Sequence, residues 1–183
     1  MAYHYWQGEL VHLRAIESQD IVFFESLDDE VNCNVDMLHF PRTKQQITSW
    51  FEGQQQRMLG DAFRWMAVNR KGEIVGTIDT FECNRRNGTF KYGITIAEVF
   101  RGQGYAQEMI RMVLQYYYYE LGYQKVTPHV YSFNLSSIKL HERMGFMKEG
   151  QLRNMLYTNG RYYDEIYYGM TKEEFNHRYG DRN

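Results

Sequence analysis

The chain has 183 residues, a formal net charge of −2 at neutral pH and two cysteines. This length suits one domain with a sizeable core, and the interspersed acidic and basic residues argue against nucleic acid or an anionic membrane as the main partner. No apolar run could span a bilayer, and the first six residues do not resemble a signal peptide. Cys33 and Cys83 stand apart from each other and from any histidine cluster, so we expect no disulfide, no metal site and a cytoplasmic protein.

Residues 1–100 show one strand pattern, two helix patterns and then three strand patterns. Ser18 can cap a helix that ends near Leu27, and Thr43 with Gln46 forms a capping box for the next helix. That helix carries an apolar stripe of Ile47, Trp50, Phe51 and Met58. Three strands in hairpin order then lead to a glycine-rich turn, which is unlike a repeated βαβ pattern. The predicted strands are residues 9–14, 63–69, 73–81 and a last one after the Asn87-Gly88 turn.

Residues 101–183 continue with a helix, a strand, a second helix and a hairpin. Asn159-Gly160 is the strongest short hairpin signal in the chain. Four consecutive tyrosines, 116–119, point all round the first helix, so we interpret them as core and rim packing. The predicted helices are residues 106–120 and 135–144, and the predicted strands are 125–131, 146–157 and 161–170, followed by a short tail.

The run Arg101-Gly102-Gln103-Gly104-Tyr105-Ala106 joins a strand to a helix. A glycine-rich turn at a helix start leaves backbone N–H groups unpaired, and these groups suit a phosphate or pyrophosphate. The run lacks the third glycine of a dinucleotide fingerprint and the Gly-Lys-Ser/Thr of a P-loop. A plain strand-to-helix turn without a ligand is the alternative interpretation.

The same run fits the pattern Arg/Gln-x-x-Gly-x-Gly/Ala and resembles the pyrophosphate-binding motif of the GNAT superfamily of N-acetyltransferases. Residues 134–146 are similar to the fourth helix of that superfamily and to the Gly-Phe that starts its next strand. Residues 13–16, 149–153 and 159–162 resemble the branch that contains ribosomal-protein N-terminal and spermidine acetyltransferases. The resemblance covers nearly the whole chain, but it does not specify a substrate.

The resemblance implies an α/β fold of the α+β type, with a mixed, mostly antiparallel sheet of six to seven strands flanked by about four helices. It implies a single N-acetyltransferase domain over residues 1–183. The implied activity moves an acetyl group from the cosubstrate acetyl-CoA to a primary amine, by direct attack in a ternary complex without a metal. The acceptor would be a protein N-terminus, a polyamine or another small amine. A non-catalytic acyl-CoA-binding regulatory module on the same fold is the alternative, and the charge disfavours a ribosome or RNA binder.

By resemblance, residues from three segments hold acetyl-CoA. The backbone of Ile94, Thr95 and Ile96 would pair with the pantetheine arm like an extra strand, and the run 101–106 would hold the pyrophosphate. Asn134 would hydrogen-bond the pantetheine and belong to the catalytic set, unless it serves only as a helix N-cap. Ser137 lies four residues before His141, so both would present one helix face to the cofactor.

Two departures from the family pattern concern the proton transfers. In related enzymes, a tyrosine that can protonate the departing thiolate often stands where this chain has His141. Histidine can also donate a proton near neutral pH, so His141 is a candidate general acid. The alternative is that His141 is a packing residue. Relatives often have a glutamate where this chain has Lys91, which cannot act as that base. Asp79 and Glu82 are the replacement candidates, unless both are solvated strand residues and water or a deprotonated amine removes the need for a base.

The acceptor side should be built by the first two helices and the last hairpin, where tyrosines flank the Asn-Gly turn. Tyr163 and Tyr167 share one strand face, and Tyr162 and Tyr168 share the other. We assign Tyr157 and Tyr163 to the pocket for the amine. The alternative is inward packing together with a contact between two copies in a homodimer.

Overall fold

The computed structural model describes residues 4–27, 42–56 and 60–180. The chain divides into two compact units: Met1–Thr80 with Gly93–Met112, and Phe81–Tyr92 with Val113–Asn183. Strands β3 (Ile74–Asn84) and β4 (Thr89–Ile96) and helix α4 (Tyr105–Tyr119) each contribute residues to both units. Cys33 and Met58 lie outside the described residues.

The first unit is built on strands in the order β1-β2-β3-β4. Strand β1 (Val11–Ala15) pairs antiparallel with β2 (Arg64–Asn69). Strand β2 also pairs antiparallel with β3, and β3 neighbours β4 in the sheet, in the order of the three predicted hairpin strands. Apolar side chains from all three strands are buried, as their strand patterns require. They include Val11, Leu13, Met66, Val68, Val75 and Ile78.

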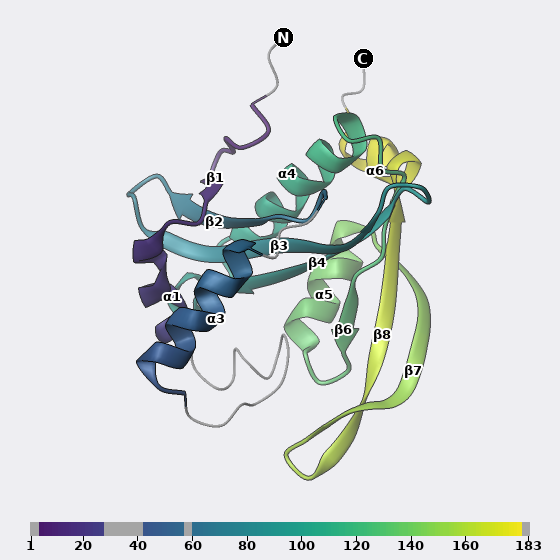
Figure 1. The fold of residues 1–183 in the computed structure, drawn as a ribbon. Coiled ribbons are helices and arrows are strands. Elements are labelled where there is room, and N and C mark those ends of the chain that lie inside the picture. Colours follow the sequence, from purple (N-terminus) through teal and green to yellow (C-terminus); the bar gives the residue numbers. More distant parts are fainter. Residues whose placement is uncertain (1–3, 28–41, 57–59, 181–183) are drawn as a thin grey trace. The chain divides into compact units, whose positions relative to one another are not determined.

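Helices α1 (Ile21–Glu25) and α3 (Lys44–Gln56) lie side by side in the first unit (Figure 1). Phe24 of α1 joins them, because its ring centroid lies 5.5 Å from that of Trp50 and 5.6 Å from that of Phe51. Both partners belong to the predicted apolar stripe of α3, so the stripe faces the neighbouring helix.

The two predicted starts of these helices differ in outcome. The capping box is confirmed: Thr43 N donates to Gln46 Oε1 at 2.8 Å, and Gln46 N donates to Thr43 Oγ1 at 3.2 Å. The Ser18 cap is wrong, because Ser18 is already the first residue of a 3₁₀ turn and Glu17 is its N-cap. The backbone N–H of Glu17 donates to Asp20 Oδ2 at 2.7 Å, so the capping carboxylate comes from within the turn.

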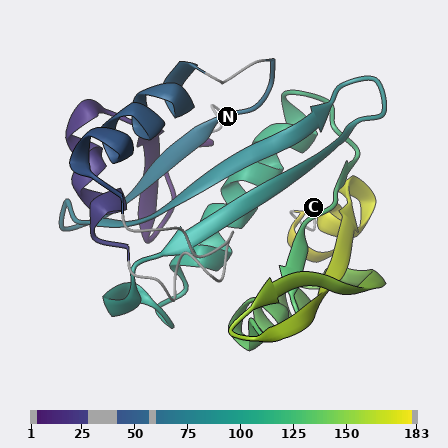
Figure 2. The ribbon, with the colours of Figure 1, turned by 60° about the horizontal axis from the view of Figure 1, so that its bottom comes forward.

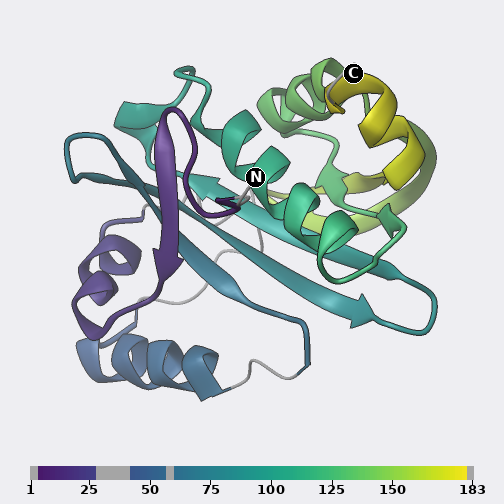
Figure 3. The same cartoon turned by 90° about the horizontal axis from the view of Figure 1, so that it is seen from above.

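One buried carboxylate fixes the start of α4 to the N-terminal segment. Glu108 is 6% exposed and accepts hydrogen bonds from the backbone N–H groups of Glu9, Leu10 and Val11 at 2.9, 2.8 and 2.8 Å. Hydrogen bonds from backbone N–H groups to a carboxylate are among the stronger ones in proteins. In the first unit, α1 and α3 lie on one side of the sheet and α4 on the other (Figure 3).

In the second unit, strand β8 (Arg161–Thr171) pairs antiparallel with β5 (Lys125–Val126), β6 (His129–Tyr131) and β7 (Met147–Thr158). Strand β5 also pairs in parallel with β4. The result is a mixed, mostly antiparallel sheet of eight strands, one more than the upper predicted number. The long β7–β8 hairpin is prominent in Figure 2, and its closing pair flanks the predicted Asn159-Gly160 turn.

The extra strand arises because the predicted strand 125–131 is split into β5 and β6. Pro128 stands between them. Its carbonyl accepts a hydrogen bond from Tyr168 N at 2.9 Å, but proline has no N–H to donate back to the ladder.

The predicted C-terminal tail is instead helix α6 (Lys172–Tyr179), which raises the α-helices of the described residues to five rather than about four. Its sequence signal is the capping box of Thr171 and Glu174, whose two hydrogen bonds measure 2.7 and 3.2 Å. Figure 3 shows α6 beside α5 (Leu135–Met144). There the Tyr179 hydroxyl donates to the Met144 carbonyl at 3.0 Å.

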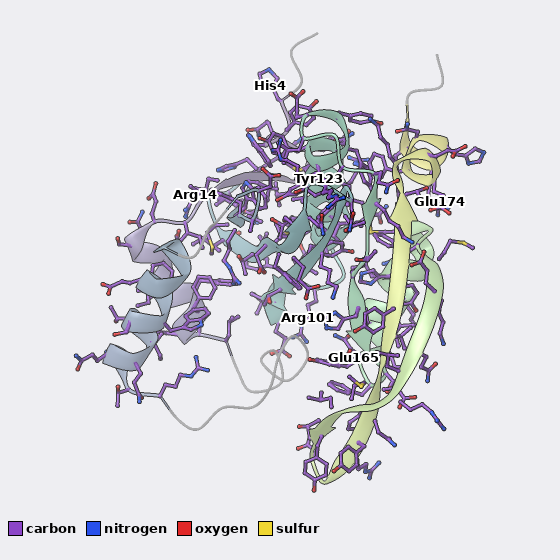
Figure 4. All side chains as sticks on the ribbon, turned by 45° about the vertical axis from the view of Figure 1, so that its right-hand side comes forward. His4, Arg14, Arg101, Tyr123, Glu165 and Glu174 are labelled. Carbon is purple, nitrogen blue, oxygen red and sulfur yellow. The ribbon has the colours of Figure 1, made fainter. Side chains whose placement is uncertain are left out.

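The run of four tyrosines packs as predicted, inside and at the rim of the core. Tyr117 and Tyr118 are buried, whereas Tyr119 is 41% exposed. Phe90 of β4 stacks on Tyr117 with ring centroids 4.2 Å apart, and Tyr123, labelled in Figure 4, contacts both rings. The Tyr118 hydroxyl, which is buried, donates to the Met170 carbonyl at 2.6 Å, so the polar end of this ring is satisfied.

Candidate active site

The glycine-rich turn of the first unit has the backbone that its sequence suggests. It follows β4 and the 3₁₀ turn Glu98–Phe100, and it leads directly into α4. Gly102 and Gly104 have φ angles of 76° and 88°, a region that side chains other than glycine rarely adopt. A Cβ at Gly102 would meet nothing within 4 Å, so the turn is open on that side.

The N–H groups of this turn are unpaired within the described part of the chain. Arg101 N donates back to Glu98 O, and Glu108 N donates to Gly104 O, but the N–H groups of residues 102–107 have no acceptor among the described residues. The exposed Arg101 lies at the start of the same turn (Figure 4). Unpaired N–H groups, the positive end of α4 and a guanidinium together suit an anion.

Strand β3 lies along one edge of β4, whereas the other edge of β4 is paired only at its first two residues. On the β3 side, the approach is so close that a Cβ at Gly76 would clash with the Thr95 carbonyl oxygen. On the other side, the pairing of β4 with β5 covers only Thr89 and Phe90. Ile94, Thr95 and Ile96 therefore have no strand partner on that edge among the described residues, and an extended ligand could pair there.

In the second unit, Asn134 is the N-cap of α5. Its Oδ1 accepts a hydrogen bond from Ser137 N at 3.1 Å, which is the capping role named as the alternative to ligand contact. Ser137 is half-buried in the first turn of the helix, and its hydroxyl lies 3.4 Å from His141 Nδ1. The predicted face with Ser137 and His141 together is thus present.

His141 is 2% exposed, and both of its ring nitrogens are engaged. Nδ1 lies 2.7 Å from the Ser137 carbonyl oxygen. Because that oxygen only accepts, Nδ1 carries the hydrogen, and Nε2 accepts from the Tyr92 hydroxyl at 2.8 Å. Burial lowers the pKa of His141 to about 4 against the opposing effect of the Ser137 hydrogen bond, so the ring is neutral near pH 7. These contacts support the packing alternative over the general acid.

The residue at the position of the family's glutamate, Lys91, forms an ion pair. Its Nζ lies 2.7 Å from Glu82 Oε2 and 5.7 Å from the centroid of the Tyr167 ring. Glu82, one of the two candidate bases, is 63% exposed and has a φ of 47°. The neighbouring strand β3 therefore brings the Glu82 carboxylate beside Lys91, where the resemblance implies a glutamate.

The other candidate base, Asp79, is also paired. It lies opposite Arg64 across β2 and β3, with 3.0 Å between Asp79 Oδ2 and the guanidinium. Burial raises the pKa of Asp79, although Arg64 acts in the opposite direction. The guanidinium also lies 5.9 Å from the centroid of the Phe24 ring, so α1 contributes to this pair.

The structure places the two predicted acceptor tyrosines on different faces of the β7–β8 hairpin. Tyr157 is 62% exposed, and its ring centroid lies 4.9 Å from that of Tyr162. Tyr163 is half-buried and meets Phe133 edge to face at 4.8 Å. Since Tyr162 and Tyr163 are neighbours on β8, the two tyrosine pairs do not share one surface.

A histidine that the sequence patterns do not single out lies on the same strand face as Tyr163 and Tyr167. His129 of β6 stacks on Tyr167 with ring centroids 5.6 Å apart, and Tyr131 is 6.0 Å away. The Tyr167 hydroxyl donates to Glu165 Oε2 at 2.9 Å (Glu165 is labelled in Figure 4). Burial and this hydrogen bond raise the pKa of Tyr167 to about 12. The sequence alone does not show that these side chains are neighbours, because β6 and β8 are far apart in the chain and meet only through strand pairing.

Neither a metal-binding cluster nor a membrane-spanning helix occurs among the described residues. No group of three or more His, Cys, Asp or Glu side chains in that part of the chain is arranged to hold a metal ion. None of the helices described is long and apolar enough to cross a bilayer.

Comparison with known proteins places this geometry in context. A family model described as "Acetyltransferase (GNAT) domain" matches residues 11–147. The SPbeta prophage-derived uncharacterized N-acetyltransferase YokL of Bacillus subtilis is 53% identical, over 98% of this chain and 100% of its own length. The spermidine N(1)-acetyltransferase of Vibrio cholerae is 28% identical, over 83% of this chain and 87% of its own length.

Among solved structures, the spermidine N-acetyltransferase from Vibrio cholerae in complex with CoA and spermine matches with a TM-score of 0.81 and 22% identity. The match covers 92% of this chain and 99% of that chain. The predicted mixed, mostly antiparallel fold is therefore confirmed, and so is the resemblance to the branch with spermidine acetyltransferases.

Proposed function

The chain belongs to the GNAT family of N-acetyltransferases, and from that premise we propose that it moves an acetyl group from acetyl-CoA to a primary amine. The amine attacks the thioester directly in a ternary complex. The observation that carries the proposal is the turn at residues 102–107, whose backbone N–H groups have no acceptor among the described residues.

The residues present fit acetyl-CoA at two places in the first unit. The turn offers backbone N–H groups and the N-terminus of α4 to the pyrophosphate. Gly102 and Gly104 contribute through their backbone alone, in a conformation that other residues rarely adopt. The open edge of Ile94, Thr95 and Ile96 pairs with the pantetheine amides, as an added strand would. An N–H of that edge also stabilises negative charge on the thioester oxygen during attack.

In the second unit, Asn134 and Ser137 are proposed to contact the pantetheine from the start of α5. The capping hydrogen bond from Ser137 N to Asn134 Oδ1 fixes the orientation of the Asn134 side chain. A fixed amide at a helix start positions a ligand with little loss of side-chain freedom.

For the acceptor, we propose a cationic primary amine, with a polyamine as the first candidate. The relatives named as spermidine acetyltransferases support this choice. In the second unit, Glu165 accepts from the Tyr167 hydroxyl, and Glu82 pairs with Lys91, whose Nζ lies 5.7 Å from the centroid of the Tyr167 ring. Carboxylates beside an aromatic ring suit a cation. A protein N-terminus and other small amines are the remaining acceptor classes.

The test is release of the CoA thiol from acetyl-CoA with a panel of spermidine, spermine, amino sugars and peptides with free N-termini, alongside calorimetry with CoA. Thiol release above the rate without amine supports the transferase. Tight CoA binding with no release on any amine supports the non-catalytic module. Two points support that alternative: the resemblance implies a glutamate where this chain has Lys91, and both nitrogens of His141 are engaged.

A further inference from the structure

His129 differs from His141 in the state of its ring nitrogens. No described residue forms a hydrogen bond to either nitrogen of His129, and its Nδ1 is the one buried side-chain nitrogen or oxygen among the described residues that has no partner. Buried polar atoms in native proteins are almost always paired, and an exception calls for an explanation. The residue as a whole is of intermediate exposure, although Nδ1 itself is buried.

The ring lies where the sheet of the second unit opens. The β4–β5 pairing ends at Phe90 and Val126, and the next strand residues on the two sides are Lys91 and His129. Both side chains contact the Tyr167 ring, His129 by stacking at 5.6 Å and Lys91 through its Nζ at 5.7 Å. The Tyr167 hydroxyl in turn donates to Glu165, one of the carboxylates proposed to attract the acceptor amine.

The groups around the ring keep it uncharged near neutral pH. Burial lowers the pKa of His129, and Lys91 of β4 acts in the same direction. Glu165 of β8 and Glu82 of β3 raise it, but the net shift is downward. Tyr167 of β8 and Tyr131 of β6 complete the surroundings, and the Tyr167 hydroxyl is neutral at this pH. A neutral imidazole with an unpaired nitrogen is able to accept a proton.

We propose that His129 is the proton acceptor for the attacking amine; this inference rests on the proposed function. An ammonium acceptor loses two protons in the reaction. One passes to the His129 imidazole and on to water, and the nitrogen lone pair then forms the C–N bond of the amide. The C–S bond breaks, its electron pair leaves on sulfur, and the second proton ends on the CoA thiol. His129 thus supplies the base that Lys91 cannot.

The test compares wild type with His129→Gln, using the full chain, spermidine as acceptor and thiol release from pH 6 to pH 10. The variant should lose about 10²-fold in kcat/KM for spermidine at pH 7. The loss should shrink towards pH 10, where the amine deprotonates in solution without a base. His177→Gln, on the exposed face of α6, is the matched control and should follow the wild-type profile.

Two readouts separate a chemical role from a structural one. KM for acetyl-CoA and the melting temperature of His129→Gln should stay close to wild type, and a loss of activity equal at every pH would overturn the assignment. If spermidine is no substrate, the most active amine of the panel replaces it. A wild type silent with every amine overturns the proposed function and this inference with it. An active wild type with an unchanged variant overturns this inference alone.

Discussion

Tyr92 on β4 donates its phenolic hydrogen to Nε2 of His141 on α5 across 2.8 Å, and both side chains are buried. The Ser137 carbonyl holds the other nitrogen, so the imidazole has one tautomer and no unused site. The ring also packs against Phe146 and Tyr168. This arrangement makes His141 part of the core of the second unit.

Tyr92→Phe should therefore destabilise the protein. The change keeps the ring but leaves Nε2 of His141 buried without a donor, and an unsatisfied buried acceptor costs about 1–3 kcal/mol. Urea unfolding at pH 7 measures the loss. Tyr162→Phe, whose ring is 64% exposed, removes the same atom at the surface and should change the free energy of unfolding by less than about 0.5 kcal/mol. Equal effects of the two variants would contradict the buried hydrogen bond.

His141 should make the stability of the fold depend on pH. Its pKa is about 4 in the folded chain against an ordinary 6.5, so between these values the unfolded chain binds more protons. Stability is thus lost as pH falls through 6.5 towards 4, by about 2 kcal/mol between pH 7 and pH 5. Urea unfolding of wild type and His141→Gln at both pH values measures the difference, and the variant should lack this part of the pH dependence.

The same variant separates packing from catalysis. If His141 is a packing residue, His141→Gln should keep thiol release within a few-fold of wild type at a temperature where both are folded. A fall of about 10²-fold in kcat with CoA affinity unchanged would instead restore the general acid that the family pattern suggested.

Gly104→Asp should weaken CoA binding by at least tenfold, about 1.4 kcal/mol. The new side chain would add negative charge at the start of α4, where the unpaired N–H groups lie, and its Cβ would lie 3.3 Å from Leu10 Cδ1. Gly72→Asp is the matched control, since Gly72 has a similar φ of 82° and open space around it, in the turn between β2 and β3. Calorimetry with CoA compares the two folded variants. Equal affinities would remove the turn from the site.

Tyr163→Leu should raise the acceptor KM several-fold and leave the KM for acetyl-CoA unchanged. Tyr163 lies on the sheet face that carries Tyr167 of β8 and His129 of β6, and an aromatic ring attracts a cation by about 0.5–2 kcal/mol. Tyr157→Leu changes the other face of the hairpin and should leave both constants unchanged. A shift of Tyr157→Leu towards monomer in sedimentation would identify that face as the homodimer contact. If neither variant alters the acceptor KM, the hairpin is not the pocket wall.

Local signals determined much of this fold from the sequence. Thr43 and Gln46 cap α3, Asn159-Gly160 closes the last hairpin, and the glycines at 102 and 104 adopt the left-handed backbone that the turn needs. Each of these signals depends on residues within one or two turns of chain, so it can be interpreted without the tertiary structure, although the equally local Ser18 cap was wrong. The same kind of signal marks α6 through its capping box, and Pro128 marks the break between β5 and β6.

The tertiary structure decided what the two histidines can do. In the sequence, His141 occupies the position where related enzymes often have a tyrosine, and His129 is one residue of the predicted strand 125–131. Folding gives His141 a donor from Tyr92, 49 residues away, and a carbonyl from its own helix. The His129 ring receives ring contacts, and its Nδ1 has no hydrogen-bond partner among the described residues. Protonation and reactivity depend on burial and on the groups that strand pairing brings together, and those groups are not local in the chain.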